Sequence, residues 1–564
     1  MKFSQMPYER INLEAVQARA VQLFVDFENA DSFPAHYGVF EEILALRSHL
    51  NTMATLCKVR HSINTLDAFY EKENDFWDET MPQLQALNNQ LYEVLLTTKF
   101  QPDYEAKLGK HFFNAMRLVK KTFDPIIMED LAEENRLVSQ YDKLMGGAQI
   151  EFRGEVYTLS GLGIFLEDPD RQTRQEAAEA SWGFLANHRD ELDDIYDKLV
   201  RVRDRMAKKL GYENFVQMAY DRYGRTDYNH EDVKRFRDGI IKHVVPLAVA
   251  GFAEQKERIG VEELTYYDVP FRFPTGNPKP QGDKEFMVQQ ATAMYDELSP
   301  DTSQFFRILV ENELLDLEQK PGKQPGGYCT FIDEYQLPFI FSNFNGTSGD
   351  VDVLTHEFGH AFQVYTARDL IDDLRWPGME AAEIHSMGME YIAYPWMKNF
   401  FGDETEKYFY DHNVSNIAFL PYGALVDAFQ HFVYENPEVT PEERRSEWRR
   451  LEQIYNPWVD YETNDYLLAG GRWQKQSHIY GAPFYYIDYC LAQICAMQIF
   501  KRSQEDRQKL WNDYVAICQV GGSLPFTEIL AVGHFDNPFD ETVVKESIAA
   551  VQDYLLTIDR SSIS

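Results

Sequence analysis

Apolar residues recur at the i, i+3, i+4 spacing of an amphipathic helix along most of this 564-residue chain. This period predicts helices over residues 12–28, 37–51, 70–97, 103–144, 170–185, 188–210, 231–260 and 284–316, and a mostly helical region from 405 to the end. Residues 148–159 alternate around Arg153-Gly154, which predicts a β-hairpin. Residues 262–283 are rich in proline, glycine and aromatic residues, which predicts a long surface connection.

The residue pattern changes between residues 321 and 349, where glycines and a dense apolar run replace the helical period. This stretch predicts a short sheet, so the fold class is mainly α with a small β-sheet. Residues 339–344 fit two roles equally well. They suit an edge strand that pairs with the extended backbone of a peptide, and they suit an ordinary inner strand.

The sheet is predicted to lead into a helix that carries H-E-x-x-H, in the segment V-D-V-L-T-H-E-F-G-H-A-F-Q at residues 351–363. Positions i and i+4 lie on one face of a helix, so His356 and His360 can share a metal ion. Glu357 lies beside them and can reach a water bound to that metal. Gly359 costs about 1 kcal/mol against alanine in a helix interior. We therefore expect another part of the backbone to approach closely there.

A catalytic zinc site needs a third protein ligand and one open position. The pattern H-E-x-x-H-x-x-G-x-x-H would supply a third histidine, but Gln363 and Thr366 occupy the extra positions. A second helix is predicted over residues 379–392, and it carries Glu380, Glu383, His385 and Glu390. We take Glu383 as the third ligand, because 27 residues after His356 leave room for a turn and a second helix alongside the first. Glu390 shares the face of Glu383 and is predicted to orient a ligand histidine.

Charge, apolar runs and cysteine content argue against several classes of protein. The net charge of −36 argues against binding of nucleic acid or of an anionic membrane surface, since both require basic patches. No run of about 18 apolar residues and no apolar signal segment at the start are found, so we expect a cytoplasmic protein. The five cysteines are scattered without a C-x-x-C pair, which favours reduced thiols over a disulfide framework.

H-E-F-G-H-A-F-Q at residues 356–363, followed by A-E-I-H-S-M-G-M-E at 382–390, resembles the thimet oligopeptidase and oligoendopeptidase F family of zinc peptidases, and within it the bacterial Pz-peptidase-like branch. Gly326-Gly327-Tyr328-Cys329 and the helical N-terminal half also fit. The resemblance implies one zinc ion held by His356, His360 and Glu383, with Glu357 as the catalytic base. It also implies a helical ellipsoid of two lobes around a deep channel.

A second candidate segment, H-I-Y-G-A-P-F-Y-Y-I-D-Y at residues 478–489, is dense in tyrosine. Peptide hydrolysis forms a tetrahedral oxyanion, and one donor aimed at it contributes about 3–4 kcal/mol. By resemblance, His478, Tyr486 and Tyr489 bind substrate and stabilise that oxyanion, with Tyr489 as the first choice. Pro483 interrupts the spacing found in the family, so Tyr480 and Tyr485 remain rivals.

Among the remaining polar residues of the second helix, His385 points to another side and is predicted to be a pocket or core residue; we keep it as a candidate substrate contact. We expect three regions. Residues 1–145 form an N-terminal helical lobe, 146–320 a helical region with the hairpin that packs on the catalytic core, and 321–564 the zinc-peptidase region with C-terminal helices.

The function predicted from the sequence is a zinc-dependent endopeptidase acting on short oligopeptides. The alternatives are a peptidyl-dipeptidase or carboxypeptidase of similar helical build, with Arg472 or Lys475 clamping the substrate's C-terminus, and a peptide-binding protein without activity. Peptides are the only partners that the sequence predicts, and it does not indicate an oligomeric state.

Overall fold

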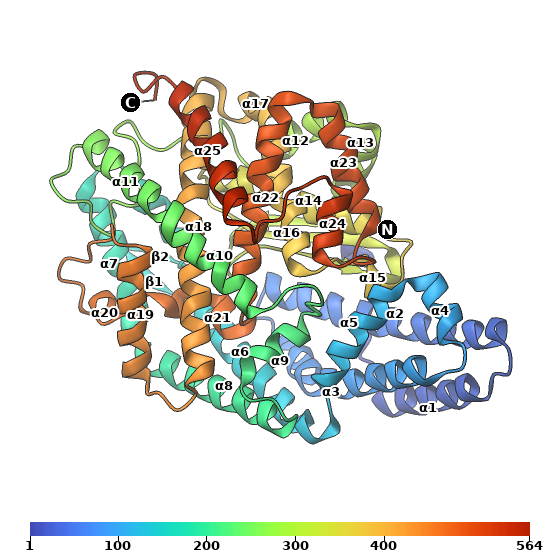
Figure 1. The fold of residues 1–564 in the computed structure, drawn as a ribbon. Coiled ribbons are helices and arrows are strands. Elements are labelled where there is room, and N and C mark those ends of the chain that lie inside the picture. The colour runs from blue at the N-terminus through green and yellow to red at the C-terminus, as the bar shows by residue number, and fades with distance from the viewer. Residues whose placement is uncertain (564) are drawn as a thin grey trace.

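The computed structural model describes residues 1–563. Its first part is helical: α1 (Leu13–Asn29), α2 (Phe33–Ile63), α3 (Ala68–Thr97), α4 (Gln101–Leu108), α5 (Lys110–Lys121) and α6 (Met128–Gly146). Helices α1 to α5 enclose a small hydrophobic cluster of their own, which also takes in Leu374 from much later in the chain. In Figure 1 these blue helices project at the lower right, away from the red and yellow part of the molecule.

Two predicted helices of this part have different bounds. The helix predicted over 37–51 runs on through α2 to Ile63. The helix predicted over 103–144 is three helices, because Gly109 has a φ of +85° and Asp124 caps a short turn that begins at Pro125. Periodicity alone does not show such breaks, because the apolar spacing resumes after each one.

The next segment confirms the predicted hairpin and consists of β1 (Ile150–Phe152), β2 (Glu155–Tyr157), α7 (Arg171–Asn187), α8 (Arg189–Lys209), α9 (Phe215–Arg222), α10 (His230–His243) and α11 (Val245–Ile259). Arg153 and Gly154 both have positive φ, as a two-residue hairpin turn of type I′ requires. Helix α9 was not predicted, because its eight residues are too few for a clear period. The single helix predicted over 231–260 is interrupted at Val244.

Residues 262–283 contain no helix or strand, but the predicted surface location is wrong for part of them. Asp268 is completely buried and forms ion pairs of 2.8 Å with Arg171 and with Arg174. Two cations compensate for the loss of hydration of this carboxylate. A segment rich in proline and glycine can therefore cross the interior when its polar groups find partners there.

The small sheet follows α12 (Lys284–Leu298) and α13 (Pro300–Glu311) and consists of β3 (Leu315–Glu318), β4 (Tyr328–Ile332) and β5 (Leu337–Phe344). The strand order is β3-β5-β4, with β3 parallel and β4 antiparallel to β5. Strand β5 is therefore central, and the edge-strand role considered for residues 339–344 is wrong. Consecutive buried residues, rather than alternating ones, mark a strand covered on both faces. Of the two edge strands, β4 is the one that packs against the helix carrying H-E-x-x-H.

The C-terminal part contains α14 (Gly349–Thr366), α15 (Asp372–Arg375), α16 (Met379–Ile392), α17 (Met397–Phe401), α18 (Thr405–Glu435), α19 (Pro441–Tyr455), α20 (Asp465–Leu468), α21 (Ser477–Gly481), α22 (Tyr486–Glu505), α23 (Arg507–Val520), α24 (Phe526–Val532) and α25 (Glu541–Thr557). Helix α16 has the predicted bounds, and every residue after Met379 is buried. It packs between α14 and α22 at the centre of the molecule (Figure 1). The mainly helical fold with a small sheet is as predicted.

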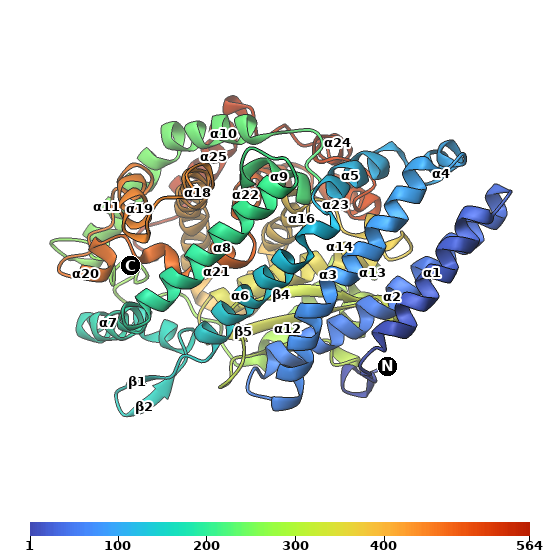
Figure 2. The same cartoon turned by 90° about the horizontal axis from the view of Figure 1, so that it is seen from below.

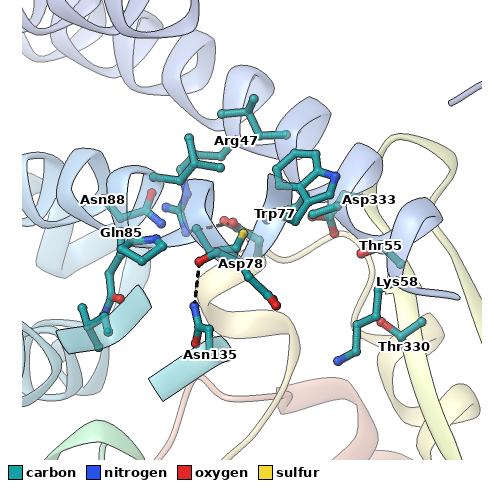
Figure 3. Close-up of a pocket in the computed structure, with 18 of the residues that line it drawn as sticks. Arg47, Thr55, Lys58, Trp77, Asp78, Gln85, Asn88, Asn135, Thr330 and Asp333 are labelled. Atoms are coloured by element: carbon teal, nitrogen blue, oxygen red, sulfur yellow. Dashed lines mark hydrogen bonds and ion pairs between the residues drawn. The ribbon is translucent and has the colours of Figure 1, made fainter. Parts of the chain in front are cut away.

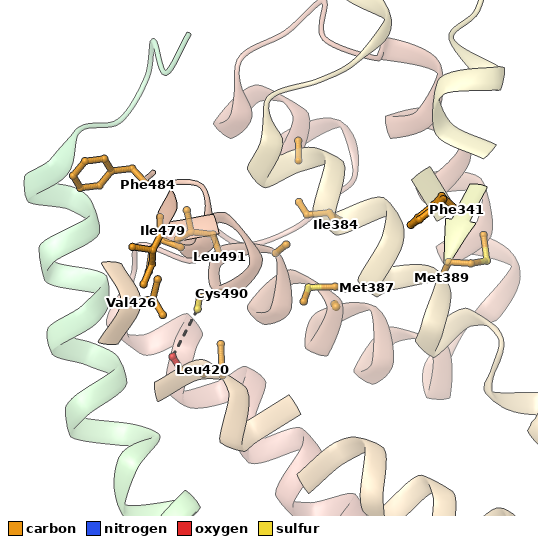
Figure 4. Close-up of a cluster of buried hydrophobic side chains, with 14 of the residues drawn as sticks. Phe341, Ile384, Met387, Met389, Leu420, Val426, Ile479, Phe484, Cys490 and Leu491 are labelled. Atoms are coloured by element: carbon orange, nitrogen blue, oxygen red, sulfur yellow. Dashed lines mark hydrogen bonds between the residues drawn. The ribbon is translucent and has the colours of Figure 1, made fainter. Parts of the chain in front are cut away.

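The core around α16 joins helices that are far apart in the sequence. Figure 4 shows Ile384, Met387 and Met389 of α16, with Leu420 of α18 and Cys490 of α22 nearby. Cys490 Sγ donates to the carbonyl oxygen of Leu420 at 3.7 Å. Helix α22 thereby packs against both α16 and α18.

A cleft of about 1010 Å³ lies between the N-terminal helices and the C-terminal part. Its walls include Trp77 and Asp78 of α3, Lys58 of α2, Asn135 of α6 and Thr330 of the edge strand β4 (Figure 3). Figure 2 shows α3, α6 and α8 running side by side along this part of the molecule. Within residues 1–563, we find no helix with the length and apolar character that a membrane crossing requires.

Candidate metal centre

Helix α14 presents His356 and His360 on one face, with their ring centroids 5.1 Å apart. The turn before it is organised by Asp350, whose carboxylate accepts from the backbone N–H of Asn345 at 2.9 Å and of Gly346 at 2.7 Å. An acidic side chain in the first turn also suits the positive end of the helix dipole. The start of the helix that carries both histidines is therefore fixed by local hydrogen bonds.

Glu383 of α16 brings a carboxylate to these two rings. Its Oε2 lies 3.2 Å from His356 Nε2 and 3.3 Å from His360 Nε2, and the donor atoms of all three residues lie within 4.8 Å of one another. Zinc bonds of 2.0–2.1 Å in a tetrahedron place neighbouring donors roughly 3.3 Å apart. The spacing and the chemistry of these donors therefore fit a tetrahedral divalent metal.

The electrostatics of His356 and Glu383 favour positive charge between these side chains. Burial disfavours an imidazolium, but hydrogen bonds with Glu383 and Glu390 raise the pKa of His356 well above its ordinary value. Burial likewise opposes ionisation of Glu383, yet the neighbouring His360 and His356 hold the pKa of Glu383 well below its ordinary value. Protons or a metal ion can supply the charge that this arrangement favours.

Glu357 is buried beside the two histidines and has a carboxylate oxygen without a hydrogen-bond partner. Burial raises the pKa of Glu357, and the histidine charges partly oppose that rise. A Cβ added to Gly327, the residue before β4, would lie 3.3 Å from Glu357 Oε1. The glycine therefore keeps the space beside this carboxylate open.

The close approach expected at Gly359 occurs between α14 and α16. A Cβ at this position would lie 2.4 Å from the carbonyl oxygen of His385 and 2.7 Å from Cα of Ser386. Both are backbone atoms, so no side-chain rotation can relieve the contact. The glycine lets the two helices that carry the three candidate ligands come together.

Two neighbours hold the candidate ligands in place. Glu390 Oε1 accepts from His356 Nδ1 at 2.7 Å, which leaves His356 Nε2 facing Glu383. Ser386 Oγ donates to Glu383 Oε2 at 2.8 Å. Such contacts fix the orientation and tautomer of a metal ligand. The spacing of Glu383 and Glu390 indicated the first contact, whereas nothing in the sequence indicated the contact of Ser386.

The tyrosine-rich segment places three of its side chains at this site. The hydroxyl of Tyr485 donates to Glu383 Oε1. Gln476 Nε2 donates to His478 Nδ1 at 2.8 Å, so His478 Nε2 carries the ring proton and donates to the hydroxyl oxygen of Tyr489 at 3.2 Å. Burial lowers the pKa of His478 to about 4, which keeps this ring neutral near pH 7. The Tyr489 hydroxyl also contacts that of Tyr485, and its proton points to an acceptor other than His478.

Three other candidates lie elsewhere. Tyr480 is completely buried and stacks on Tyr141 at 3.9 Å, so it is part of the core. Tyr486 packs edge-on against the His478 ring, with the centroids 5.0 Å apart, and its contact with substrate stays a prediction. His385 is completely buried, and its Nδ1 donates to the carbonyl oxygen of Ala381 at 2.7 Å.

The cleft comes near the candidate ligands at Trp376. Trp376 lines the cleft, and its ring centroid lies 6.5 Å from that of His360. Thr330 and Phe331 of the edge strand β4 line it as well. Of the two side chains considered as C-terminal clamps, Arg472 forms an ion pair of 3.1 Å with Glu452. Lys475 lies 5.4 Å from the ring of Trp182, outside the lining of the cleft.

Sequence and structure comparisons agree with this geometry. Residues 3–123 match the Peptidase M3 N-terminal domain, and residues 164–547 match Peptidase family M3. Oligopeptidase PepF of Bacillus subtilis (strain 168) is 21% identical over 432 residues, which cover 70% of this chain and 60% of that protein's length.

Two solved structures are similar over nearly the whole chain. A structure described as Pz peptidase A with inhibitor 2 is 49% identical, with a TM-score of 0.98 and full coverage of both chains. A candidate oligoendopeptidase F from Bacillus anthracis str. Ames is 46% identical, with a TM-score of 0.93 over 99% of both chains. The chain therefore belongs to peptidase family M3, and it is a metallopeptidase with the helical fold of these relatives.

Proposed function

We propose that the protein is a zinc-dependent endopeptidase that hydrolyses internal bonds of short oligopeptides, with His356, His360 and Glu383 as the zinc ligands. The observation that carries the proposal is the convergence of two imidazole nitrogens and a carboxylate oxygen at 3.2 and 3.3 Å beside the unpaired carboxylate of Glu357. Two nitrogens and one oxygen also form a donor set that zinc favours.

Glu357 acts as the general base and then as the general acid. Its carboxylate removes a proton from the attacking water and passes it to the nitrogen of the leaving amine. The raised pKa of this buried side chain supports the role, because a base is most effective when its pKa approaches the working pH. Zinc, when bound, supplies a Lewis acid that polarises the scissile carbonyl and makes a nearby water more acidic.

Tyr489 donates to the oxyanion that forms as the carbonyl carbon becomes tetrahedral. His478 donates to the Tyr489 oxygen, so the tyrosine proton remains available for the substrate. Tyr485 is the second candidate donor, because its hydroxyl lies beside the candidate ligands; its proton would have to turn from Glu383 to the oxyanion. Each such donor contributes about 3–4 kcal/mol to stabilising the transition state.

The cleft and the edge strand select extended, short substrates. Strand β4 has one unpaired edge, and main-chain hydrogen bonds along such an edge bind an extended peptide without requiring particular side chains. A peptide paired there passes Gly327 and therefore the carboxylate of Glu357. The walls formed by α2, α3 and α6 exclude folded proteins from this surface.

Metal analysis together with product mapping tests the proposal. The purified protein is expected to contain one zinc per chain, and Glu357→Gln is expected to retain zinc but lose peptide hydrolysis. Products from a peptide library are expected to arise by internal cleavage, equally from free and amidated C-termini. Absence of stoichiometric metal, or full activity of Glu357→Gln, would contradict the proposed mechanism. Cleavage that requires a free C-terminus would replace the endopeptidase with a peptidyl-dipeptidase or carboxypeptidase.

A further inference from the structure

The carboxylate of Glu390 bridges two histidines, of which only one is a candidate metal ligand. Its Oε1 accepts from His356 Nδ1 at 2.7 Å, and its Oε2 accepts from His412 Nε2 at 2.8 Å. His412 lies on α18 and is 5% exposed, and it is not part of the sequence motifs carried by α14 and α16. A buried histidine on a third helix therefore contacts the residue that orients a candidate ligand.

The hydrogen bonds around His412 determine which ring nitrogen carries its proton. Asn413 Nδ2 donates to the carbonyl oxygen of Phe409 at 2.8 Å, and a carbonyl only accepts, so this atom is the amide nitrogen. Its second proton goes to the hydroxyl oxygen of Tyr394 at 2.9 Å. The Tyr394 proton then goes to His412 Nδ1 at 2.6 Å. His412 Nδ1 is an acceptor, and Nε2 must carry the proton that Glu390 accepts.

Glu390 connects His412 to the candidate metal site. Glu390 receives one proton from His412 and one from His356 Nδ1, so both of its oxygens act as acceptors. His356 Nδ1 is then engaged by Glu390, and Nε2, which faces Glu383, is the nitrogen left to bind a metal ion once it gives up its proton. A metal-binding imidazole needs this tautomer, because the coordinating nitrogen must be unprotonated.

We propose that His412 is a positioning residue of the metal site: through Glu390 it fixes the tautomer and orientation of His356. The hydrogen bonds run from Asn413 through Tyr394 and His412 to Glu390, and Asn416 Nδ2 lies 3.4 Å from both ring nitrogens of His412. A residue of α18 thereby restricts the orientation of the His356 ring on α14. This inference rests on the proposed metal-binding function and names residues that the motif does not contain.

The experiment measures zinc affinity by competition with a chromophoric chelator, and the visible spectrum of the cobalt-loaded protein. His412→Leu removes the donor to Glu390 and is expected to weaken zinc binding by about 10–100-fold. His412→Gln places an amide N–H near the position of Nε2 and is expected to restore most of the affinity. Tyr394→Phe removes the hydroxyl that donates to His412 Nδ1 and accepts from Asn413 Nδ2, leaves the His412–Glu390 contact in place, and is expected to cause a smaller loss.

His36 provides the matched control. It is a buried histidine, 2% exposed, whose Nδ1 contacts the hydroxyl of Tyr104 at 2.8 Å in the separate core of the N-terminal helices. His36→Gln is expected to lower thermal stability while leaving zinc affinity and the cobalt spectrum unchanged. A role of His412 in packing alone predicts that His412→Leu behaves in the same way.

The outcomes separate this inference from the proposed function. If the wild-type protein binds no zinc, the proposed metal site itself is wrong. If the wild type binds zinc and His412→Leu binds it as tightly, the inference about His412 is wrong while the metal site stands. Should His412→Leu fail to fold, equal zinc affinity of Tyr394→Phe, His412→Gln and the wild type would overturn the inference.

Discussion

Gly359→Ala tests whether the approach of α14 to α16 builds the metal site. The new Cβ would lie 2.4 Å from the carbonyl oxygen of His385, and ordinary van der Waals contact begins near 3.4 Å. The two helices must therefore separate by about 1 Å, since the opposing atoms belong to the backbone. Metal–ligand distances tolerate only about 0.2 Å. The separation would pull His356 and His360 away from Glu383.

The expected effects on stability and on metal binding differ in size. Overpacking costs about 1–3 kcal/mol, and alanine recovers about 1 kcal/mol of helix propensity. Net destabilisation should therefore not exceed about 2 kcal/mol. Zinc affinity, in contrast, should fall by about 100-fold or more, beyond the usual effect of losing an outer contact. Chelator competition and thermal unfolding with and without zinc measure the two effects.

Gly183→Ala is the control, because a Cβ added to this glycine of α7 meets nothing within 4 Å. This variant should be stabilised by about 0.4–1 kcal/mol and bind zinc like the wild type. If Gly359→Ala also becomes more stable and keeps its zinc affinity, the close helix contact does not hold the ligands together.

Three further predictions concern other residues. Tyr489→Phe should lower kcat by about 10²–10³-fold with little change in KM, as measured by steady-state cleavage of a quenched peptide; an unchanged kcat would exclude the oxyanion role. Burial lowers the pKa of His36 from 6.5 to about 4. The unfolded chain therefore binds a proton below pH 6.5 that the folded chain does not, and this contribution to stability is lost as the pH falls from 6.5 towards 4. The loss is about 2 kcal/mol at pH 5, and the difference between the thermal midpoints near pH 7.5 and pH 5 should be smaller in His36→Gln than in the wild type; equal pH sensitivity would contradict this. Asp488→Ala leaves the buried Arg225 guanidinium, 2.7 Å from that carboxylate, without its counter-charge. The substitution should lower the free energy of unfolding, measured by thermal unfolding, by about 3–5 kcal/mol. A decrease of less than 1 kcal/mol would refute the pair's structural importance.

The local parts of the site could be predicted from the sequence. The i, i+4 spacing of His356 and His360 and the bounds of α16 depend on short-range periodicity, which the sequence carries directly. The mid-helix Gly359 indicated a close backbone contact, because its cost in a helix must be compensated by packing. The hairpin at Arg153-Gly154 was predicted for a similar reason, since the turn chemistry is local.

The parts that depend on tertiary contacts could not be predicted. Whether β5 is central or at the edge depends on where β3 and β4 pair, and the sequence of one strand does not contain that information. Tyr480 and Tyr485 lie in the same segment, yet one stacks in the core and the other contacts Glu383. His412 reaches the site only because α18 packs beside α16 and α22.

Anomalous diffraction at the zinc edge, from crystals grown with zinc, tests the central claim most directly. The account predicts one strong peak about 2.0–2.1 Å from His356 Nε2, His360 Nε2 and a Glu383 carboxylate oxygen. A fourth direction should stay open toward Glu357 and the cleft. A peak elsewhere, or no peak between these three side chains, would contradict the account.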